Sequence, residues 1–377
     1  MGAKDTPLFK IVFQRITKSL DKAISFAEFM SLALYHKDFG YYSVPATRQI
    51  GRKGDFFTSV SVGETFGFLL AHRIRGAMEQ RFESSKPLYV IEQGAHDGQL
   101  AIDVLRGWDE ISSQSEEPVG ELRYRIIEPR ESIREFLRGR FAEEGYEDRI
   151  EVVDSANAAI AEQGVFLCNE LLDAFPVDRL TFSGERWLEK VVEVDVAEES
   201  FAWGTRELPE PLKPFADQLG TDFTEGYDTE VCPAIDDWVP GVADLFSENG
   251  LWWVIDYGYE AADYYAPSRR TGTLRCYRKH EATEDPFESP GEIDITAHVN
   301  FSHLETAVEA HGLVMKQFTD QHHFLIQAAK PWLLSLEGQA PDKAAAARLR
   351  QFQTLTHPSL MGQQFKVMEF EKARQGR

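Results

Sequence analysis

The sequence of 377 residues has little cysteine and no long apolar run. Its three cysteines lie far apart and form no CxxC pair, which argues against a disulfide framework or a zinc site and favours a reducing compartment. No apolar stretch approaches the roughly 20 residues that span a bilayer, and the amino terminus lacks a secretory pattern. We therefore expect a cytoplasmic protein without a membrane span, or a mitochondrial one if the source is eukaryotic, although no clear transit peptide is seen.

Positive charge is scarce as well. Lys and Arg number 40 against 62 Asp and Glu, which gives a net charge of −22. Nucleic acid is disfavoured as a partner because phosphate backbones are bound through basic patches. A cationic substrate is compatible with this charge, although most of the acids are expected to form a solubilising surface. The length predicts one large elaborated domain or two domains, and 43% hydrophobic residues suffice for a substantial core.

The clearest local signal is a strand, a turn and a helix between residues 87 and 105. The apolar run 88–91 does not alternate, which is typical of a strand buried on both faces. Gly94 and Gly98 follow, and a helical pattern begins at Leu100. This order is typical of the start of a nucleotide-binding α/β unit, where glycines let a ligand approach the backbone and the beginning of the helix.

The glycine spacing argues against a dinucleotide. The turn reads G-x-x-x-G instead of G-x-G-x-x-G, and Glu92 and Asp97 stand on either side of the position that a phosphate would take. Like charges roughly 4 Å apart cost about 1–4 kcal/mol, depending on the local dielectric. A nucleoside with a sulfonium and an amino group fits better, so the stretch predicts S-adenosylmethionine. An ordinary turn with incidental glycines is the alternative.

Polar residues close the next predicted strands. Glu128 is placed to bind ribose hydroxyls, and Asp154 could reach an adenine edge. Asn169 and Glu170 follow a further strand, at the sheet edge where open α/β folds place their chemistry. A buried carboxylate there needs a cation or hydrogen-bond donors, and a sulfonium or a guanidinium would supply the cation. Taken singly, each of these residues is equally compatible with a strand end or a helix cap.

The remaining pattern predicts additions around this α/β core. Alternating runs after residue 177 predict an antiparallel meander, followed by a connector rich in proline and acid over 208–232. A fifth core strand is predicted over 251–259, a closing β-hairpin over 314–328, and a helical end over 341–375. We expect the chain to divide into an N-terminal helical region (1–82) with an active-site loop (50–61), a cofactor-binding core (83–330) with a β-rich insertion (177–232), and a C-terminal helical extension (331–377).

Taken in order, nine segments of the chain resemble the MidA family of S-adenosylmethionine-dependent methyltransferases. That family includes the mitochondrial arginine methyltransferase that assists assembly of respiratory complex I. Two places depart from its pattern: Ala95 and His96 replace the Pro and central Gly of E-x-G-P-G-x-G-x-L, and Val60-Ser61 replaces a Pro-Glu pair. The matching segments are 29–42, 54–67, 92–100, 128–129, 169–177, 255–258, 272–280, 290–299 and 361–368.

The resemblance implies a class I (Rossmann-like) methyltransferase fold of the α/β class, with a seven-stranded sheet, an inserted antiparallel meander, and helical additions at both ends. It implies methyl transfer from S-adenosyl-L-methionine to a protein side chain, with arginine nitrogen as the favoured acceptor. A respiratory-complex subunit is one candidate substrate, and a homodimer is a candidate assembly.

Residue roles follow from the same resemblance and from the strand-end argument. Glu170 is expected to orient and polarise a cationic acceptor, with Asn169 and Asp173 beside it as further catalytic residues. No metal site is expected. The cofactor-binding candidates are Glu92, Gly94, Gly98, Glu128, Asp154, Ser155, Thr58 and Ser59, and the substrate-binding candidates are Asp55, Phe57, Asp256, Tyr257 and His280.

Two other functions fit parts of the sequence. A catalytically weak or inactive assembly protein that kept the fold is supported by Ala95 and His96 in the cofactor turn. An NAD-dependent oxidoreductase is disfavoured by the glycine spacing and the flanking acids. Saturable binding of S-adenosylmethionine separates the enzyme from the scaffold, and tighter binding of NADH would favour the oxidoreductase.

Overall fold

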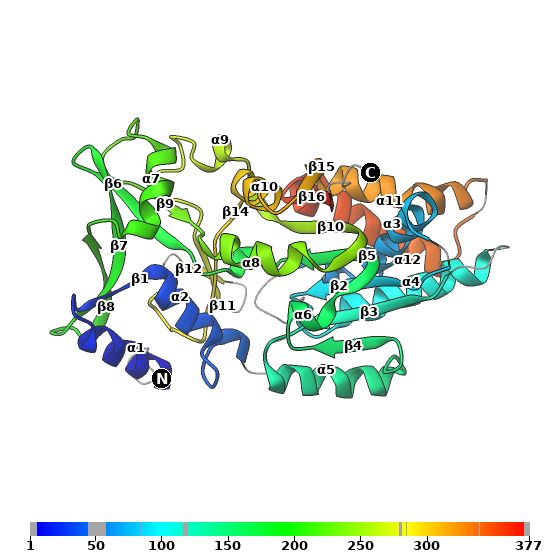
Figure 1. Ribbon diagram of the computed structural model, residues 1–377, viewed down its shortest axis with the longest axis horizontal. Helices are drawn as coiled ribbons and strands as arrows, with labels where there is room; N and C mark the ends of the chain where they lie inside the picture. The colour runs from blue at the N-terminus through cyan, green and yellow to red at the C-terminus, as the bar shows by residue number, and fades with distance from the viewer. Residues whose placement is uncertain are drawn as a thin grey trace.

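The computed structural model describes residues 6–43, 58–83, 85–115, 120–278, 281–283, 285–338 and 340–372. A large mixed sheet flanked by helices forms one part of the molecule, and a smaller antiparallel sheet with α1 and α2 lies beside it (Figure 1).

The central sheet has the strand order β15-β16-β10-β5-β2-β3-β4, with the short β14 paired to β10. Strands β2 to β5 and β10 are parallel, and β16 runs antiparallel to both of its neighbours. The strand order reverses between β2 and β5, which is the switch point where open α/β sheets bind ligands. The predicted α/β sheet is therefore confirmed: seven strands follow this order, and the short β14 is an eighth. Its strands are β2 (Leu88–Gln93), β3 (Leu122–Ile127), β4 (Ile150–Val153), β5 (Ala161–Asn169), β10 (Phe246–Tyr259), β14 (Val299–Asn300), β15 (Leu313–Asp320) and β16 (Phe365–Lys372).

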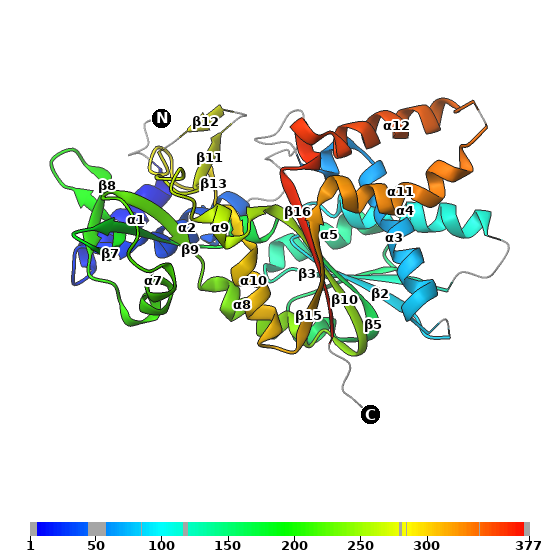
Figure 2. The same cartoon turned by 90° about the horizontal axis from the view of Figure 1, so that it is seen from above.

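Helices cover both faces of this sheet (Figure 2). Val90 packs into the cluster on one face and Ile91 into the cluster on the other, and both are fully buried. Burial on both faces explains why β2 is a continuous apolar run. One face is covered by α3 (Thr65–Arg81), α4 (Gln99–Gln114), α5 (Glu131–Glu144), α11 (Gln321–Ser335) and α12 (Lys343–Thr356), and the other by α6 (Ala156–Ala159), α8 (Ala234–Ala243) and α10 (Phe301–Glu309).

The second sheet contains the predicted meander. Its order is β1-β7-β6-β9 with β8 paired to β7, and Gly184 and Glu185 adopt positive φ at the hairpin between β6 and β7. A three-stranded sheet, β12-β11-β13, accompanies it. The elements are α1 (Pro7–Lys18), β1 (Ala23–Ser25), α2 (Phe26–Tyr35), β6 (Asp178–Ser183), β7 (Arg186–Asp195), β8 (Ser200–Arg206), α7 (Lys213–Leu219), β9 (Tyr227–Val231), α9 (Ala261–Tyr264), β11 (Arg275–Arg278), β12 (Glu281–Thr283) and β13 (Asp294–Thr296).

The predictions for the last third of the chain are partly wrong. The second arm of the expected 314–328 hairpin is the helix α11, because the side chain of Asp320 accepts a hydrogen bond from the backbone of His323 and begins a helix there. The true partner of β15 is β16, which lies in the segment expected to be helical, so 331–377 is not a helical extension throughout. The connector 208–232 contains α7 and β9, and β9 extends the meander sheet beside β6.

Candidate functional site at the carboxyl edge of the sheet

The turn after β2 has an unusual backbone. Gly94, His96 and Gly98 have φ values of 88°, 49° and 78°, in the left-handed region that favours glycine. His96 is therefore strained where the family usually has glycine. A Cβ atom on Gly98 would lie 2.5 Å from the ring of Phe141, so the turn is packed tightly against α5.

Glu92, at the end of β2, is buried and accepts a hydrogen bond of 2.7 Å from the hydroxyl of Tyr124. Burial raises the pKa of Glu92 to about 7. Asp97, the second acid of this turn, already has a partner. It is half exposed and forms an ion pair with Arg140. Burial alone would raise the pKa of Asp97, but the neighbouring His96 and Arg140 hold that pKa well below its usual value. Asp97 is thus a neutralised carboxylate and not a second charge facing a ligand.

Glu128 lies at the end of β3 and is 7% exposed. Both of its carboxylate oxygens accept hydrogen bonds from Arg130, at 2.7 Å from Nε and 2.8 Å from Nη2. Arg130 also donates to the carbonyl of Tyr42, which ties this strand end to the N-terminal region. Asp154 and Ser155 lie exposed at the end of β4, where Ser155 Oγ donates to Asp154 Oδ1 at 2.8 Å.

Glu170 is the residue after β5, and its φ of 53° is also left-handed. Its backbone N–H is held by the carbonyl of Ile255 at 2.9 Å, while its Oε1 faces the side-chain amide of Asn169 at 3.0 Å and the backbone N–H of Ser59 at 3.4 Å. A strained residue pinned in this way is typical of an active site. Among the described residues, the buried Oδ1 of Asn169 has no hydrogen-bond partner, so it can accept from a ligand.

Asp256, at the carboxyl end of β10, organises the turn that follows Glu170. Its Oδ2 accepts hydrogen bonds from the backbone of Leu171, Leu172 and Asp173 at 2.9–3.3 Å, and its Oδ1 accepts from Tyr257 at 2.8 Å. Four donors fill the usual acceptor positions of one carboxylate. The contacts of Asp256, which was expected to bind substrate, are thus with the protein backbone.

Burial and like charge dominate this part of the site. Burial, followed by the nearby carboxylate of Asp256, raises the pKa of Glu170 to about 8. Burial and the charges of Asp256, Glu170 and Asp294 raise the pKa of Asp173 well above its ordinary value. No lysine or arginine in the described part of the chain forms an ion pair with Glu170, Asp173 or Asp256. This cluster is therefore suited to a cation supplied from outside.

Sequence reasoning missed some residues of the site. The hydroxyl of Tyr42 donates to Asp294 at 2.8 Å, and that of Tyr35 donates to the carbonyl of Ala174 at 2.8 Å. Both tyrosines lie in the matching segment 29–42, but neither was predicted as a site residue. Asp294 lies in one of the matching family segments, and that match was the only available signal for it.

Of the remaining predicted residues, some are described by the structure and others are not. The ring of Tyr257 packs on Phe365 with centroids 3.9 Å apart, and burial followed by the charge of Glu170 raises its pKa. Thr58 is buried in a turn closed by its own bonds with Ser61. Asp55, Phe57 and His280, like most of the predicted loop 50–61, lie outside the described residues.

The residues present fit a cationic nucleoside. The turn from Gly94 to Gly98 has the left-handed backbone of a glycine turn, and Glu128 can accept from a ribose diol through its remaining lone pair. Asn169 offers a buried oxygen without a hydrogen-bond partner among the described residues. The two arginines beside these carboxylates among the described residues, Arg130 and Arg140, are already paired with Glu128 and Asp97, which disfavours a phosphate here.

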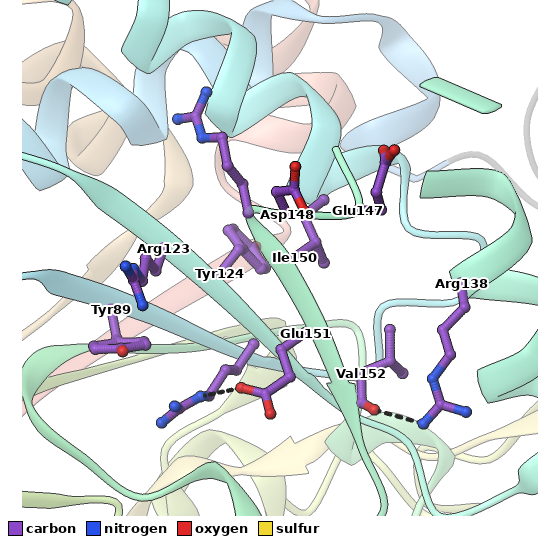
Figure 3. Close-up of a pocket in the computed structure, with 11 residues that line it drawn as sticks. Tyr89, Arg123, Tyr124, Arg138, Glu147, Asp148, Ile150, Glu151 and Val152 are labelled. Carbon is purple, nitrogen blue, oxygen red and sulfur yellow. Dashed lines mark hydrogen bonds and ion pairs between the residues drawn. The ribbon is translucent and has the colours of Figure 1, made fainter. Parts of the chain in front are cut away.

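A separate cavity of about 480 Å³ lies along the outer strands β3 and β4, close to their amino ends (Figure 3). Its arginines already have partners: Arg125 binds Glu151 at 2.7 Å, and Arg138 donates to the carbonyl of Val152 at 3.0 Å. None of the residues that line the cavity belongs to the glycine turn or to the group around Glu170, so the cavity is not part of the site.

The described residues offer neither a metal site nor a membrane-spanning helix. No group of His, Cys, Asp and Glu in them could hold a metal ion. None of their helices is both long and apolar enough to cross a membrane.

Comparisons with known proteins agree with this geometry. The family model described as "Putative S-adenosyl-L-methionine-dependent methyltransferase" matches residues 69–319. The crystal structure of a "likely methyl transferase from Burkholderia thailandensis bound to S-adenosyl-homocysteine" is 30% identical, with a TM-score of 0.85 over 99% of this chain and 94% of that one. The mitochondrial protein arginine methyltransferase NDUFAF7 is 24% identical in zebrafish (Danio rerio), over 91% of this chain and 82% of that protein, and 24% identical in mouse (Mus musculus), over 96% and 83%. The cytoplasmic location expected above is not established, because these relatives are named mitochondrial.

Proposed function

We propose that this chain, which belongs to the S-adenosyl-L-methionine-dependent methyltransferase family, transfers a methyl group to an arginine side chain of a protein. The zebrafish and mouse relatives are named protein arginine methyltransferases, which supports arginine as the acceptor. The observation that carries the proposal is the position of the Glu170 carboxyl group: it is half-buried near the buried carboxyl group of Asp256, and no lysine or arginine of the described residues forms an ion pair with either of them.

A guanidinium suits this cluster better than a neutral acceptor. Each buried carboxyl group costs free energy when it ionises without a partner, and an opposite charge within about 4–6 Å lowers a carboxyl pKa by about 1–3 units. A bound arginine would therefore let Glu170 ionise at neutral pH. The planar guanidinium also offers several N–H donors that a carboxylate can orient.

The bound cofactor supplies the electrophilic methyl group. The turn from Gly94 to Gly98, Glu128 and the free oxygen of Asn169 are proposed to hold it, with Asp154 and Ser155 beside the adenine. Methyl transfer is an in-line displacement, so alignment and electrostatic stabilisation are the main tasks left to the protein.

The chain's own residues then have distinct tasks. Glu170, ionised by the bound cation, orients the acceptor nitrogen, while Asp256 fixes the turn that carries Glu170 and Asp173. We assign cofactor binding to the core (83–330) and acceptor binding to the place where the N-terminal region contacts the site. There the hydroxyl of Tyr35 donates a hydrogen bond to the carbonyl of Ala174, and that of Tyr42 donates to Asp294.

The test is methylation of a host-cell lysate with tritiated S-adenosyl-L-methionine. The wild type should label protein, and acid hydrolysis should release the label as methylated arginine. Glu170→Gln should reduce the labelling rate by about 100-fold or more, the size expected for loss of one essential electrostatic contact.

Glu260→Gln is the matched control. Glu260 is a glutamate directly after β10, at the same edge of the sheet, but it is exposed. Its variant should label like the wild type. Label recovered in lysine or in base-labile esters, or equal labelling by Glu170→Gln, would contradict the proposal.

An inactive scaffold is the second candidate, and one observation favours it. His96 occupies a left-handed position in the cofactor turn, where a side chain adds strain and bulk. Calorimetry decides: saturable binding of S-adenosyl-L-methionine below millimolar concentration supports the enzyme, and no saturable binding supports the scaffold.

A further inference from the structure

A buried glutamine connects the C-terminal helices to the site. Gln321 is the first residue of α11 and is fully buried. Its Nε2 donates to the carbonyl of Leu355 in α12 at 3.0 Å, and its Oε1 accepts from the hydroxyl of Ser59 at 2.9 Å. The Ser59 side chain is also fully buried, so water does not compete for these bonds.

Ser59 passes this connection on to Glu170. Its backbone N–H faces Glu170 Oε1 at 3.4 Å, which is longer than the usual N–H···O bond of about 2.7–3.2 Å. A contact of this length is sensitive to small shifts of the turn that carries Ser59. The bonds between Thr58 and Ser61 shape that turn internally but do not attach it to the sheet or to the helices.

We propose that Gln321 is a positioning residue for methyl transfer: it anchors Ser59 to α11 and α12 so that the backbone amide of Ser59 stays on the carboxyl group of Glu170. The inference rests on the proposed function, because that function assigns the contact with the acceptor to Glu170. A glutamine is suited to the role because one amide group both donates to Leu355 and accepts from Ser59.

The surroundings of Glu170 make this amide important. Three carboxyl groups face it, those of Asp173, Asp256 and Asp294, and the ring of Tyr257 lies beside it. All three carboxyl groups favour the neutral form of Glu170. The amide groups of Ser59 and Asn169 favour the anion. Loss of the Ser59 contact should therefore raise the pH at which Glu170 ionises.

The test compares Gln321→Leu with Ser59→Ala, which removes only the hydroxyl and is the milder change. The initial rate of tritium transfer from S-adenosyl-L-methionine to arginine in lysate protein is measured from pH 6 to 10. Both variants should shift the midpoint of the rising limb upward by about half a unit or more, and lower the rate at pH 7 by about threefold to tenfold. Binding of S-adenosylhomocysteine to Gln321→Leu, measured by calorimetry, should stay within about twofold of the wild type.

Gln351→Leu is the structural control. Gln351 accepts from the backbone and hydroxyl of Thr65 and so holds the start of α3, but it does not contact Ser59. Its loss should lower the melting temperature without moving the pH midpoint.

The outcomes separate the two proposals. If Glu170→Gln loses activity while Ser59→Ala keeps the wild-type midpoint, the role of Gln321 is overturned and the proposed function stands. If Glu170→Gln labels like the wild type, the proposed function fails and the inference with it. If Gln321→Leu does not fold, Ser59→Ala decides alone.

Discussion

The two halves of the site treat their carboxyl groups in opposite ways. On the cofactor side, Glu128 is bonded to Arg130 and Asp97 is paired with Arg140. On the acceptor side, Glu170 and Asp173 are half-buried near the buried Asp256 and Asp294, and no lysine or arginine of the described residues forms an ion pair with Glu170 or Asp173.

This difference shows which carboxyl groups are stabilised when a cationic ligand binds. Paired carboxylates form a finished binding surface, while unpaired ones raise the free energy of the empty site and lower it when a cation arrives. The acceptor side should therefore cost stability, and so should Glu92, the buried carboxyl group of the cofactor side that is bonded to a tyrosine hydroxyl instead of an arginine.

The largest expected effect is on stability as a function of pH. Burial raises the pKa of Glu170 to about 8 and that of Glu92 to about 7, above the values of an unfolded chain. Folding therefore favours their neutral forms, so their contribution is present at about pH 4–5 and is lost as the pH rises toward 8. We expect the free energy of unfolding, from urea titrations of the ligand-free protein, to fall by about 3–5 kcal/mol over this window.

Glu170→Gln removes the larger of these two contributions. Its unfolding free energy should exceed that of the wild type at pH 8 and approach it at pH 5, the opposite sign to its effect on activity. If the wild type instead becomes more stable between pH 5 and 8, the difference described between the two halves of the site is wrong.

The next effect concerns the glycine turn, and the chain offers its own control. Gly98 and Gly145 have nearly the same φ, 78° and 76°, but a Cβ on Gly98 meets Phe141 at 2.5 Å while one on Gly145 meets nothing within 4 Å. Gly145→Ala should cost about 1–2 kcal/mol for backbone strain alone. Gly98→Ala should cost about 1–3 kcal/mol more for overpacking, by urea titration.

Only Gly98→Ala should also weaken binding of S-adenosylhomocysteine, because only Gly98 lies in the cofactor turn. Equal losses of stability, with unchanged binding in both variants, would show that the turn is not packed as described.

The smallest effect is expected for Glu128→Gln. The substitution keeps the shape but removes the charge that binds Arg130 and would accept ribose hydroxyls. A hydrogen bond to a charged group contributes about 1.5–3 kcal/mol, so the Kd for S-adenosylhomocysteine should rise by about 10–100-fold in calorimetry. The exposed Glu121→Gln is the control, and an unchanged Kd in Glu128→Gln would remove Glu128 from the cofactor site.

The core of the fold could be predicted because its signals are local. Strands β2 and β5 are buried on both faces and read as apolar runs, and the rule for parallel sheets then places Asn169 and Glu170 at the active edge. Strand β16 was predicted as helix because its residues do not alternate between buried and exposed, and its pairing with β10 and β15 is long-range.

The acceptor side was harder to predict for the same reason. The bond between Tyr42 and Asp294 joins positions 252 residues apart, and Gln321 reaches Ser59 across 262. The charge state of Glu170 depends on such neighbours and on burial, and neither is a property of its own segment.

The most direct test of the central claim is a 13C-detected titration of the Glu170 carboxyl group, assigned by its absence in Glu170→Gln. With S-adenosylhomocysteine alone, the midpoint should lie near 8. Saturating ethylguanidine, a minimal arginine side chain, should lower it by about 1–3 units because the cation favours the carboxylate. A midpoint that does not move when ethylguanidine is added would contradict the account.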